Sequence, residues 1–375
     1  MPFHFLLLPF KDLKVAIVAD WLTNFAGAEK VILTLHHHFP DAPIYTTIYN
    51  SKKMPGFEEA DIRTSFLQHW PFAKKKHQLF LKWMPLAVES FDLSEYDIVI
   101  SSSHSCAKGI ITKPETLHIC YCHTPMRYAW DDCHNYIRNS NLPWLVKKMV
   151  PFMMQKIRLW DRLAADRVDH FIANSSFVAE RIQKYYGRES EVINPPVDTE
   201  NFHISEKPEE YFLAVGRLIP YKKFDLLVET FNQLGLPLKI VGTGPEEKKL
   251  RQIAKENIEL LGHISNEELR KTYANCKAFL FPQIEDFGIV PIEAMASGRP
   301  VIALKKGGAL DSIQEGVTGI FFEEQTPESL TEAIKKLEKT TFDPQKIRQH
   351  AQEFNSQRFL EKLDDFIQRK WQKNP

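Results

Sequence analysis

The sequence predicts an α/β fold built from two doubly wound domains. Short apolar runs alternate with helical patterns, as in Lys14–Asp20 (KVAIVAD) followed by a helical pattern over Ala28–His38. Such nearly continuous apolar runs are typical of parallel strands buried on both faces. The alternation stops near Val192 and restarts near Tyr211, and a length of 375 residues suits two domains of ordinary size.

Each half supplies enough strand-like runs for its own sheet. In the first half they are 14–20, 96–101, 117–122 and 170–173, and in the second 211–216, 238–241, 258–261, 278–281 and 300–303. Between the halves, Pro195 and Pro196 precede a polar stretch, which favours a stiff connector over a helix. The tail from Pro344 to Lys373 is predicted to be helical, with an apolar face of Phe354, Phe359, Leu363, Phe366 and Ile367.

Composition excludes several classes of function. Forty-eight basic residues balance 48 acidic ones, which disfavours nucleic acid as a partner. The five cysteines are an odd number in a long chain and indicate a reducing, cytoplasmic compartment. A zinc site at Cys120, Cys122, His123, Cys133 and His134 is the alternative, but the spacing matches no common zinc pattern, so no metal is predicted. The apolar start lacks a basic n-region and is a poor signal peptide, and no run is long enough to span a bilayer.

Two glycine-containing turns of the second half suggest an anion site. Arg217 and Lys222 follow the run that ends at Gly216 and precede a helix predicted from Phe224. A guanidinium, an ammonium and free helix amides together suit a diphosphate, although two surface cations in a loop are the simpler alternative. Gly242, in Val241-Gly-Thr-Gly-Pro, allows close approach of backbone to a nucleotide, or only a tight turn.

The segment 281–295 (FPQIEDFGIVPIEAM) is the most informative. Glu285 lies in an acidic loop and Glu293 in the first turns of a helix that Pro291 suits. The two carboxylates suit two hydroxyl pairs, one on a hexose and one on a ribose. The backbone amides of Phe287, Gly288 and Ile289 are expected to hold the sugar or its phosphate; these three residues complete the loop. Helix-dipole pairing alone is the alternative for Glu293.

In the first half, Gly27 and His123 are the candidates. Gly27 follows the first strand and opens a helix, but the loop lacks the G-x-G-x-x-G pattern, which counts against a dehydrogenase. His123 ends the run 117–122 and therefore lies where ligands of parallel sheets bind; a merely structural histidine is the alternative.

Together these motifs resemble the family-four retaining glycosyltransferases of the GT-B fold, in which two Rossmann-like domains face each other across a cleft. The resemblance covers nearly the whole chain in motif order. It rests on the Gly27 loop, His123-Thr-Pro, Asn174-Ser-Ser, Asn-Pro-Pro-Val-Asp at 194–198, Gly216-Arg-Leu with Lys222, Gly242-Thr-Gly-Pro, and Glu285 with seven residues before Glu293.

The resemblance implies domains at 1–198 (acceptor side) and 199–354 (donor side), with a C-terminal helix of about 355–375 packed back on the first. It implies that Arg217 and Lys222 bind the donor diphosphate and stabilise the leaving group. Glu293 then binds the ribose and Glu285 the transferred sugar, whereas His123 faces the reacting centre. Backbone near His263 and Ile264 is implied to meet the base, and Gly27 lets the first domain approach the phosphates. No cofactor or metal is implied.

Two features narrow the resemblance. Many members have two glycines before the Ala-Glu pair, whereas Ala26 takes the first position here. The run 122–131 (CHTPMRYAWD) is similar to the branch of O-antigen mannosyltransferases that use GDP-mannose. The expected partners are thus a GDP- or UDP-hexose and a glycan or lipid-linked acceptor for bacterial surface polysaccharide. A nucleotide-sugar epimerase and a non-catalytic sugar-nucleotide-binding protein are the alternatives.

Two segments, 70–86 and 137–160, carry basic residues among aromatic ones and contain no acidic residue. Their composition is typical of helices that lie at a membrane interface. They predict docking to the anionic inner face of the cell membrane; solvated helix faces packed on the first domain are the alternative.

Overall fold

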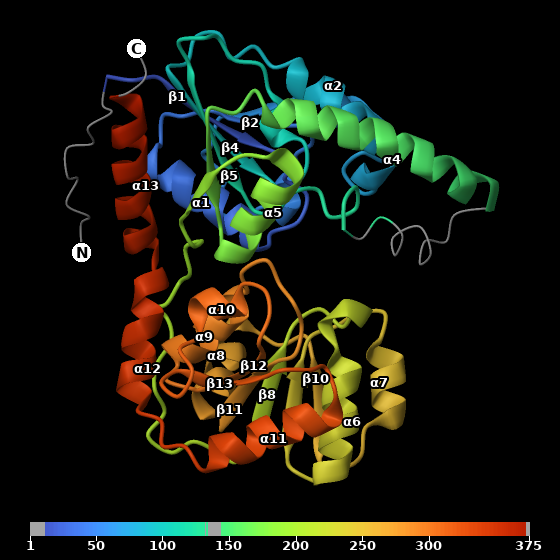
Figure 1. Cartoon of the computed structure of the whole chain (residues 1–375), viewed down its shortest axis with the longest axis vertical. Helices are drawn as coiled ribbons and strands as arrows, with labels where there is room; N and C mark the ends of the chain where they lie inside the picture. Colours follow the sequence, from blue (N-terminus) through green and yellow to red (C-terminus); the bar gives the residue numbers. More distant parts are fainter. Residues whose placement is uncertain (1–11, 132, 134–143, 373–375) are drawn as a thin grey trace. The chain divides into compact units, whose positions relative to one another are not determined.

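The apolar runs form the strands of two parallel sheets in the computed structural model, which describes residues 12–131, 133 and 144–372 (Figure 1). The chain divides into two units. The first contains the residues up to Asn194 and those from Leu360 onward, and the second is Pro195–Phe359. The apolar N-terminal run up to residue 11 and the part of the 137–160 segment before Trp144 lie outside the described residues.

In the described part of the first unit, seven parallel strands form one sheet in the order β3-β2-β1-β4-β5-β6-β7. The strands are β1 (Val15–Ala19), β2 (Ile44–Thr46), β3 (Ile62–Thr64), β4 (Ile98–Ser103), β5 (Leu117–Cys122), β6 (His170–Ala173) and β7 (Ser190–Val192). The helices are α1 (Gly27–His38), α2 (Met84–Glu89), α4 (Trp144–Ala165), α5 (Ser176–Tyr186) and α13 (Ser356–Trp371), with 3-10 turns η1 (Ser51–Lys53), η2 (Phe66–His69), η3 (His77–Trp83) and η4 (Ala107–Gly109).

Side chains alternate along the strands, so buried residues lie on both faces of this sheet and pack against helices. Ala16, Val18 and Val99 pack in one cluster with residues of α2 and α4, and Cys120 and Cys122 pack with α5. Asp364 of α13 contacts His38 of α1, with 2.8 Å between Asp364 Oδ1 and His38 Nε2. The C-terminal helix therefore belongs to the first unit from Leu360 onward.

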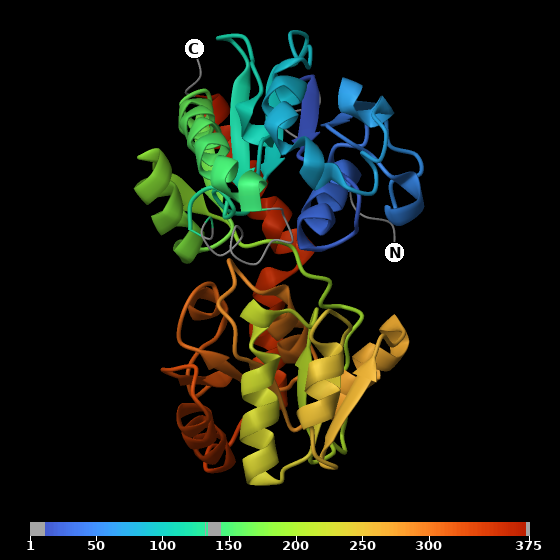
Figure 2. The same ribbon diagram turned by 90° about the vertical axis from the view of Figure 1, so that its right-hand side faces the viewer.

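The described part of the second unit contains six parallel strands in the order β10-β9-β8-β11-β12-β13. Figure 2 shows the ribbon of this unit from a second side. The strands are β8 (Phe212–Val215), β9 (Leu238–Val241), β10 (Ile258–Gly262), β11 (Ala278–Phe281), β12 (Val301–Leu304) and β13 (Gly319–Phe322). The helices are α6 (Phe224–Leu234), α7 (Glu247–Ile253), α8 (Asn266–Asn275), α9 (Ile289–Ala296), α10 (Ala309–Ser312), α11 (Pro327–Glu338) and α12 (Pro344–Ala351), with η5 (Pro220–Lys222) and η6 (Gln352–Phe354).

Two buried clusters sandwich this second sheet. Phe212 and Leu280 face α6 and α11 in one cluster, whereas Leu213 and Phe279 face α8, α9 and α12 in the other. Local sequence sets the helix ends: Thr326 caps α11 by accepting from the Ser329 amide, and Pro327 occupies its first turn. The predicted strand runs are all present, with ends shifted by up to two residues.

The cysteines are buried thiols. Cys106, Cys120, Cys122, Cys133 and Cys276 are all free. Cys120 and Cys122 lie on β5 with their side chains in the core of the sheet. In the part of the chain that the structure describes, no group of three His, Cys, Asp or Glu side chains is arranged to hold a metal ion.

Candidate functional site

The second sheet reverses its strand order between β8 and β11, which is where open parallel sheets bind ligands. Lys222 follows β8 on η5, and Glu285 follows β11. Their side chains meet: Lys222 Nζ lies 3.0 Å from Glu285 Oε1, with side-chain exposures of 15% and 20%. The structure therefore brings these two predicted residues together as a half-buried ion pair.

Arg217 lies on the same loop as Lys222, two residues after β8. Its side chain is exposed, and it makes no hydrogen bond or ion pair with another described residue. Because a guanidinium without a protein partner keeps all its donors available, Arg217 is suited to an external anion.

Gly242 allows the backbone of this loop to pack closely. It has φ +139°, and a Cβ there would lie 1.9 Å from the carbonyl oxygen of Gly216. The amide of Gly216 in turn donates to the Val241 carbonyl at 2.9 Å. The turn after β9 thus supports the turn after β8 from behind, and both predicted glycines act on the backbone that carries Arg217.

A second pair of glycines supports the Glu285 loop. A Cβ on Gly307 would lie 2.6 Å from the Glu285 carbonyl oxygen, and one on Gly308 would lie 2.3 Å from the Cα of Phe287. The Gly308 amide also donates to the Glu285 carbonyl at 3.0 Å. Gly307 and Gly308 were not predicted from the sequence, although their position after β12, next to β11 in the sheet, is a usable signal.

The remaining loop residues divide between core and surface. Phe287 is buried against Phe354, with 5.7 Å between ring centroids, so only its backbone can face a ligand. Gly288 has φ +93° and precedes α9. A Cβ at this position would lie 2.8 Å from Cζ of Phe281, so the glycine leaves room for that ring. Ile289 is half-buried at the start of α9.

Glu293 points back into the unit from the second turn of α9. Its Oε2 accepts a hydrogen bond of 3.0 Å from the hydroxyl of Tyr273, a buried residue of α8 that was not predicted from the sequence. The tyrosine fixes one carboxylate oxygen and leaves the half-buried carboxylate oriented. Ile264 follows β10 and packs, like Ile289, against the same apolar cluster.

The first sheet reverses its strand order between β1 and β4. Asp20 directly follows β1 and His104 directly follows β4. His104 Nδ1 lies 2.9 Å from Asp20 Oδ2, and the carboxylate also accepts four backbone amides between His104 and Ala107, at 2.6–2.9 Å. Although burial alone would raise the pKa of Asp20, the charge of His104 and these hydrogen bonds hold that pKa well below its usual range.

His123 lies beside this pair, directly after the next strand of the sheet, β5. Its Nε2 is hydrogen-bonded to Ser102 Oγ at 2.8 Å, and its ring centroid is 6.4 Å from that of His104. Burial and the charge of His104 lower the pKa of His123 to about 3, so the imidazole is neutral at physiological pH. It can therefore hydrogen-bond a hydroxyl but cannot act as a cation toward phosphate.

Hydrogen bonds join the sequence motifs around His123. Asn174 donates to the His123 carbonyl at 3.0 Å, and Asn194 donates to the Asn174 carbonyl at 3.1 Å. Gly27 lies at the start of α1, where the Ala26 amide donates to Glu29 Oε2 at 2.9 Å. The helix entry is thus fixed by Glu29 rather than by a second glycine.

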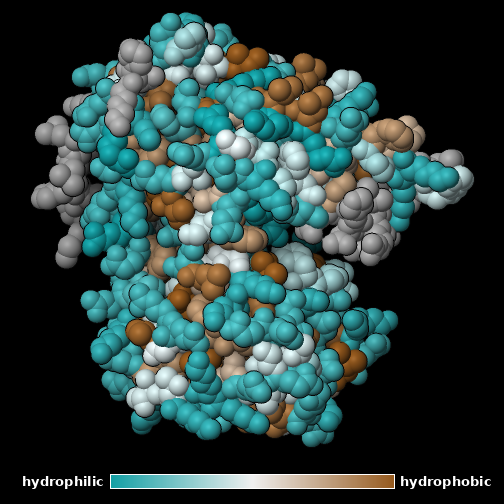
Figure 3. All heavy atoms as spheres, viewed as in Figure 1, coloured by the Kyte–Doolittle hydropathy of each residue, from teal (hydrophilic) through white to brown (hydrophobic). Residues whose placement is uncertain are grey.

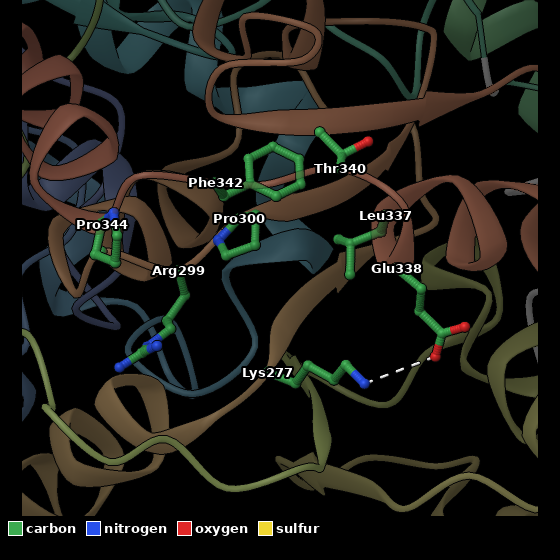
Figure 4. Close-up of a pocket in the computed structure, with 9 residues that line it drawn as sticks. Lys277, Arg299, Pro300, Leu337, Glu338, Thr340, Phe342 and Pro344 are labelled. Carbon is green, nitrogen blue, oxygen red and sulfur yellow. Dashed lines mark ion pairs between the residues drawn. The ribbon is translucent and has the colours of Figure 1, made fainter.

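Two cavities stand out in the described chain. The larger, of about 390 Å³, is lined by Lys277 and Pro300, which precede β11 and β12, and by residues after α11 (Figure 4). It lies at the amino ends of the strands, opposite the Lys222–Glu285 pair. The smaller, of about 280 Å³, lies in the first unit and includes Trp21, Glu29 and His104.

Comparison with known families accounts for this arrangement. Residues 25–201 match the model of "Glycosyltransferase Family 4", and residues 198–354 match "Glycosyl transferases group 1". The chain belongs to glycosyltransferase family 4. The resemblance seen in the sequence is thereby confirmed for the family, and the two parallel-sheet, Rossmann-like units confirm the GT-B fold class.

Relatives of this glycosyltransferase are distant. An uncharacterised glycosyltransferase of Methanocaldococcus jannaschii is 29% identical over 48% of this chain and 53% of its own. A GDP-mannose-dependent phosphatidylinositol monomannoside mannosyltransferase of Mycobacterium tuberculosis is 28% identical over 47% and 54%. An O-antigen chain mannosyltransferase of Salmonella typhimurium is 31% identical over 38% and 43%. The chain thus spans about half the length, or less, of these curated relatives.

Solved structures share the fold over nearly the whole glycosyltransferase. Anabaena Alr3699/HepE, solved in complex with UDP, has a TM-score of 0.71 at 17% identity and covers 95% of this chain and 100% of its own. The lipopolysaccharide outer core galactosyltransferase WaaB has a TM-score of 0.67 at 18% identity and covers 96% and 100%. At these identities the likeness shows the fold alone.

Proposed function

We propose that this glycosyltransferase moves a hexose, mannose from GDP-mannose, to a glycan or lipid-linked saccharide in bacterial surface polysaccharide synthesis, with retention of anomeric configuration. The observation that carries the proposal is the Lys222–Glu285 pair with Arg217 beside it, at the strand-order reversal of the second sheet. Two cations and an oriented carboxylate match a sugar joined to a diphosphate.

In this mechanism the bond between the anomeric carbon and the diphosphate oxygen breaks, and the acceptor oxygen bonds to the same face. The acceptor proton passes to the leaving phosphate. Arg217 and Lys222 meet the negative charge that develops on the diphosphate, since preorganised donors stabilise such charge strongly. Glu285 orients sugar hydroxyls and is not the paired nucleophile of a glycosidase. Glu293, held by Tyr273, binds the ribose hydroxyls.

Gly27, Gly216, Gly242, Gly288 and the backbone of Phe287, Ile289 and Ile264 complete the proposed donor contacts. His123 contributes a neutral hydrogen-bonding group toward the sugar, in agreement with its lowered pKa. No cofactor or metal takes part in the proposal, because the cations of the loop supply the charge that a metal would otherwise supply.

The choice of mannose and GDP rests on two supports. One is the 122–131 run, and the other is that two curated relatives are named mannosyltransferases, one of them GDP-mannose-dependent. Thermal unfolding with GDP-mannose, UDP-glucose and ADP-glucose tests it. Saturating true donor should stabilise the fold by about 2.7 kcal/mol at a hundredfold excess over its dissociation constant. A higher unfolding temperature with UDP-glucose alone would overturn the assignment of GDP-mannose as donor. An unchanged unfolding temperature with all three nucleotide sugars would overturn the proposed function.

Product analysis separates the proposal from its rivals. An epimerase converts the nucleotide sugar without an acceptor, and a binding protein releases no nucleotide. The transferase should release GDP from GDP-mannose faster when a lipid-linked saccharide is added. Proton NMR of the product should show the α configuration of the donor, and a β product would exclude retention.

We further propose that the first unit docks on an anionic membrane surface. Phe72 and Phe152 are 71% and 73% exposed, on the η2–η3 segment and on α4. The same two segments carry the lysines Lys74, Lys75, Lys76, Lys82, Lys147, Lys148 and Lys156. Figure 3 shows hydrophobic patches among hydrophilic atoms on the surface formed by α2 and α4. Exposed aromatic rings on lysine-rich segments suit an anionic membrane interface. No helix among the described residues is long and apolar enough to cross a membrane.

A further inference from the structure

We infer that Arg181 of α5 is a positioning residue for the proposed transfer, because its guanidinium fixes the loop that follows His123 and so aims the His123 ring. The inference rests on the proposed function, in which His123 hydrogen-bonds the sugar. It adds a residue that the proposed mechanism does not use and that acts only through its neighbours.

The chain leaves the first sheet at His123. This residue directly follows β5, and its amide still donates to the Ser103 carbonyl of the neighbouring strand β4 at 2.8 Å. The next eight residues, here called the β5 loop (residues 124–131), form turns rather than a helix or a strand. Loops without regular hydrogen bonding are the more mobile parts of a fold. The aim of the His123 ring therefore depends on what holds the β5 loop.

Arg181 joins the two ends of the β5 loop. Its Nη1 donates to the Thr124 hydroxyl, and its Nη2 donates to the Pro125 carbonyl at 3.4 Å. Nη2 also forms an ion pair with Oδ2 of Asp131, the last residue of the loop. Arg181 is only 6% exposed, so solvent weakens these interactions little. A planar guanidinium presents several donors in a fixed fork and can hold both ends at once.

The same face of α5 carries a second contact with the β5 loop. Tyr185 lies one helical turn after Arg181, and its hydroxyl donates to Oδ1 of Asp131. Its ring stacks on Trp130, with ring centroids 4.9 Å apart and an interplanar angle of 23°. Because Arg181 pairs with Oδ2 and Tyr185 with Oδ1, both oxygens of Asp131 are occupied by α5. The far end of the loop is thereby fixed on this helix.

Stability alone does not account for this arrangement. A buried ion pair often contributes no more to stability than well-packed apolar residues of similar volume, because desolvation offsets the attraction. Apolar residues would not hold the chain beside His123, however. Asn174 donates to the His123 carbonyl at 3.0 Å, and Arg181 binds the next two residues, so three successive residues are fixed from α5 and its start.

The fixed backbone aims one nitrogen of the His123 ring. Nε2 is hydrogen-bonded to Ser102 Oγ at 2.8 Å, whereas Nδ1 makes no hydrogen bond with another described residue. Nδ1 is therefore the atom that remains for a sugar hydroxyl. Displacement of such a group by about 1 Å can lower a rate by roughly 10²-fold, so holding the β5 loop matters for the proposed transfer.

A paired variant, Arg181→Met with Asp131→Leu, separates positioning from stability. It removes both charges and leaves no buried charge without a partner, so the thermal midpoint should change little. The kcat for release of GDP from GDP-mannose should fall about 10–100-fold, because the β5 loop loses the bonds that aim His123. The KM for GDP-mannose should stay nearly unchanged, since the proposed diphosphate contacts lie in the second unit.

Arg188→Met is the matched control. The guanidinium of Arg188 also donates to backbone carbonyls, those of Ala165, Val168 and Asp169, at 2.6–2.9 Å. These carbonyls lie at the end of α4 and just before β6, at the amino edge of the sheet, whereas His123 lies at the carboxyl edge. Arg188→Met should therefore lower the thermal midpoint and leave the kcat of the folded protein unchanged.

Arg181→Lys is the second variant. It keeps a cation beside Asp131, but a single ammonium does not reproduce the fork that joins both ends of the β5 loop, so kcat should still fall about tenfold. The NMR signal of the His123 ring C–H, identified by its loss in His123→Gln, is a readout that needs no turnover. It should shift in Arg181→Lys and in the paired variant, and it should stay in place in Arg188→Met.

The result that would overturn the inference is a paired variant with native kcat per folded molecule and an unshifted His123 signal, whatever its thermal midpoint. Arg181 would then be a purely structural residue. If the paired variant does not fold, Arg181→Lys decides by the same two measurements. If the native chain transfers no sugar, the transferase proposal fails, and the His123 signal alone still decides whether Arg181 positions the ring.

Discussion

Lys222 and Glu285 form an ion pair across the strand-order reversal of the second sheet, with 3.0 Å between Nζ and Oε1. The pair is half-buried, so its attraction is screened less than that of a surface pair. In the proposed reaction, the diphosphate competes with Glu285 for Lys222, and the carboxylate is thereby released toward the sugar. The ion pair thus couples phosphate binding to sugar binding.

Lys222→Ala should lower kcat/KM by roughly 10²–10³-fold, because a preorganised cation at the leaving group is lost. Steady-state release of GDP measures this effect. Lys248→Ala is the control, since Lys248 is an exposed residue of α7 after the neighbouring strand β9. Equal rates for the two variants would remove Lys222 from the site.

Glu285→Gln should lower kcat about 10–100-fold while GDP binds at least as tightly as before, because Lys222 loses its internal partner. Turnover with isothermal titration of GDP separates the two effects. Arg217→Ala should instead weaken GDP binding, because it removes a guanidinium that contacts the diphosphate in the proposed site. The donor assignment fails if Glu285→Gln keeps most of its kcat while Arg217→Ala loses nothing.

Gly242→Ala should destabilise the chain by more than about 2 kcal/mol, because its Cβ would overlap the Gly216 carbonyl in a strained backbone conformation. The thermal midpoint should fall by roughly 4–8 °C. Gly235→Ala is the matched control, since Gly235 has φ +69° and open space around its Cβ position, so it should cost only about 1 kcal/mol. Similar losses for both variants would show that backbone strain, not the contact, decides.

His123 should stay neutral down to pH 5, because burial and His104 lower its pKa to about 3. Its pKa in the unfolded chain is about 6.5, so protons favour the unfolded state. The stability that neutral His123 contributes is therefore complete above pH 6.5 and is lost as the pH falls toward 3. The NMR shift of the His123 ring C–H against pH measures this, and a midpoint near 6.5 would contradict it.

Replacing Phe72, Met149 and Phe152 by serine should abolish flotation with vesicles that contain anionic lipid, because these side chains supply exposed apolar surface among lysines. Native chain should float at low salt and less at high salt. The control replaces Ile253, Leu310 and Val317, which are exposed apolar residues of the second unit. Native chain that stays at the bottom of the gradient at low salt would defeat the membrane proposal.

The elements that the sequence missed share a physical cause. β2, β3 and β7 have three residues each, and β3 and β7 lie at the sheet edges, where Arg63 and Glu191 are solvated. Such strands are held by neighbours in the sheet rather than by an apolar pattern of their own. Tyr273 was not predicted because its hydrogen bond to Glu293, 20 residues along the chain, joins two different helices, and no local pattern shows that contact.

The sequence by itself determined the fold class and the loops that carry Arg217, Lys222, Glu285 and His123, because apolar periodicity and turn glycines are local properties. The family followed from the resemblance of the motifs and of their order along the chain. Only the tertiary structure decided that Lys222 pairs with Glu285, that Gly242 makes room for Gly216, and that Asp20 holds His104 beside a cavity. These relationships depend on strand order, which brings residues 26 to 84 positions apart into contact, and no local pattern encodes it.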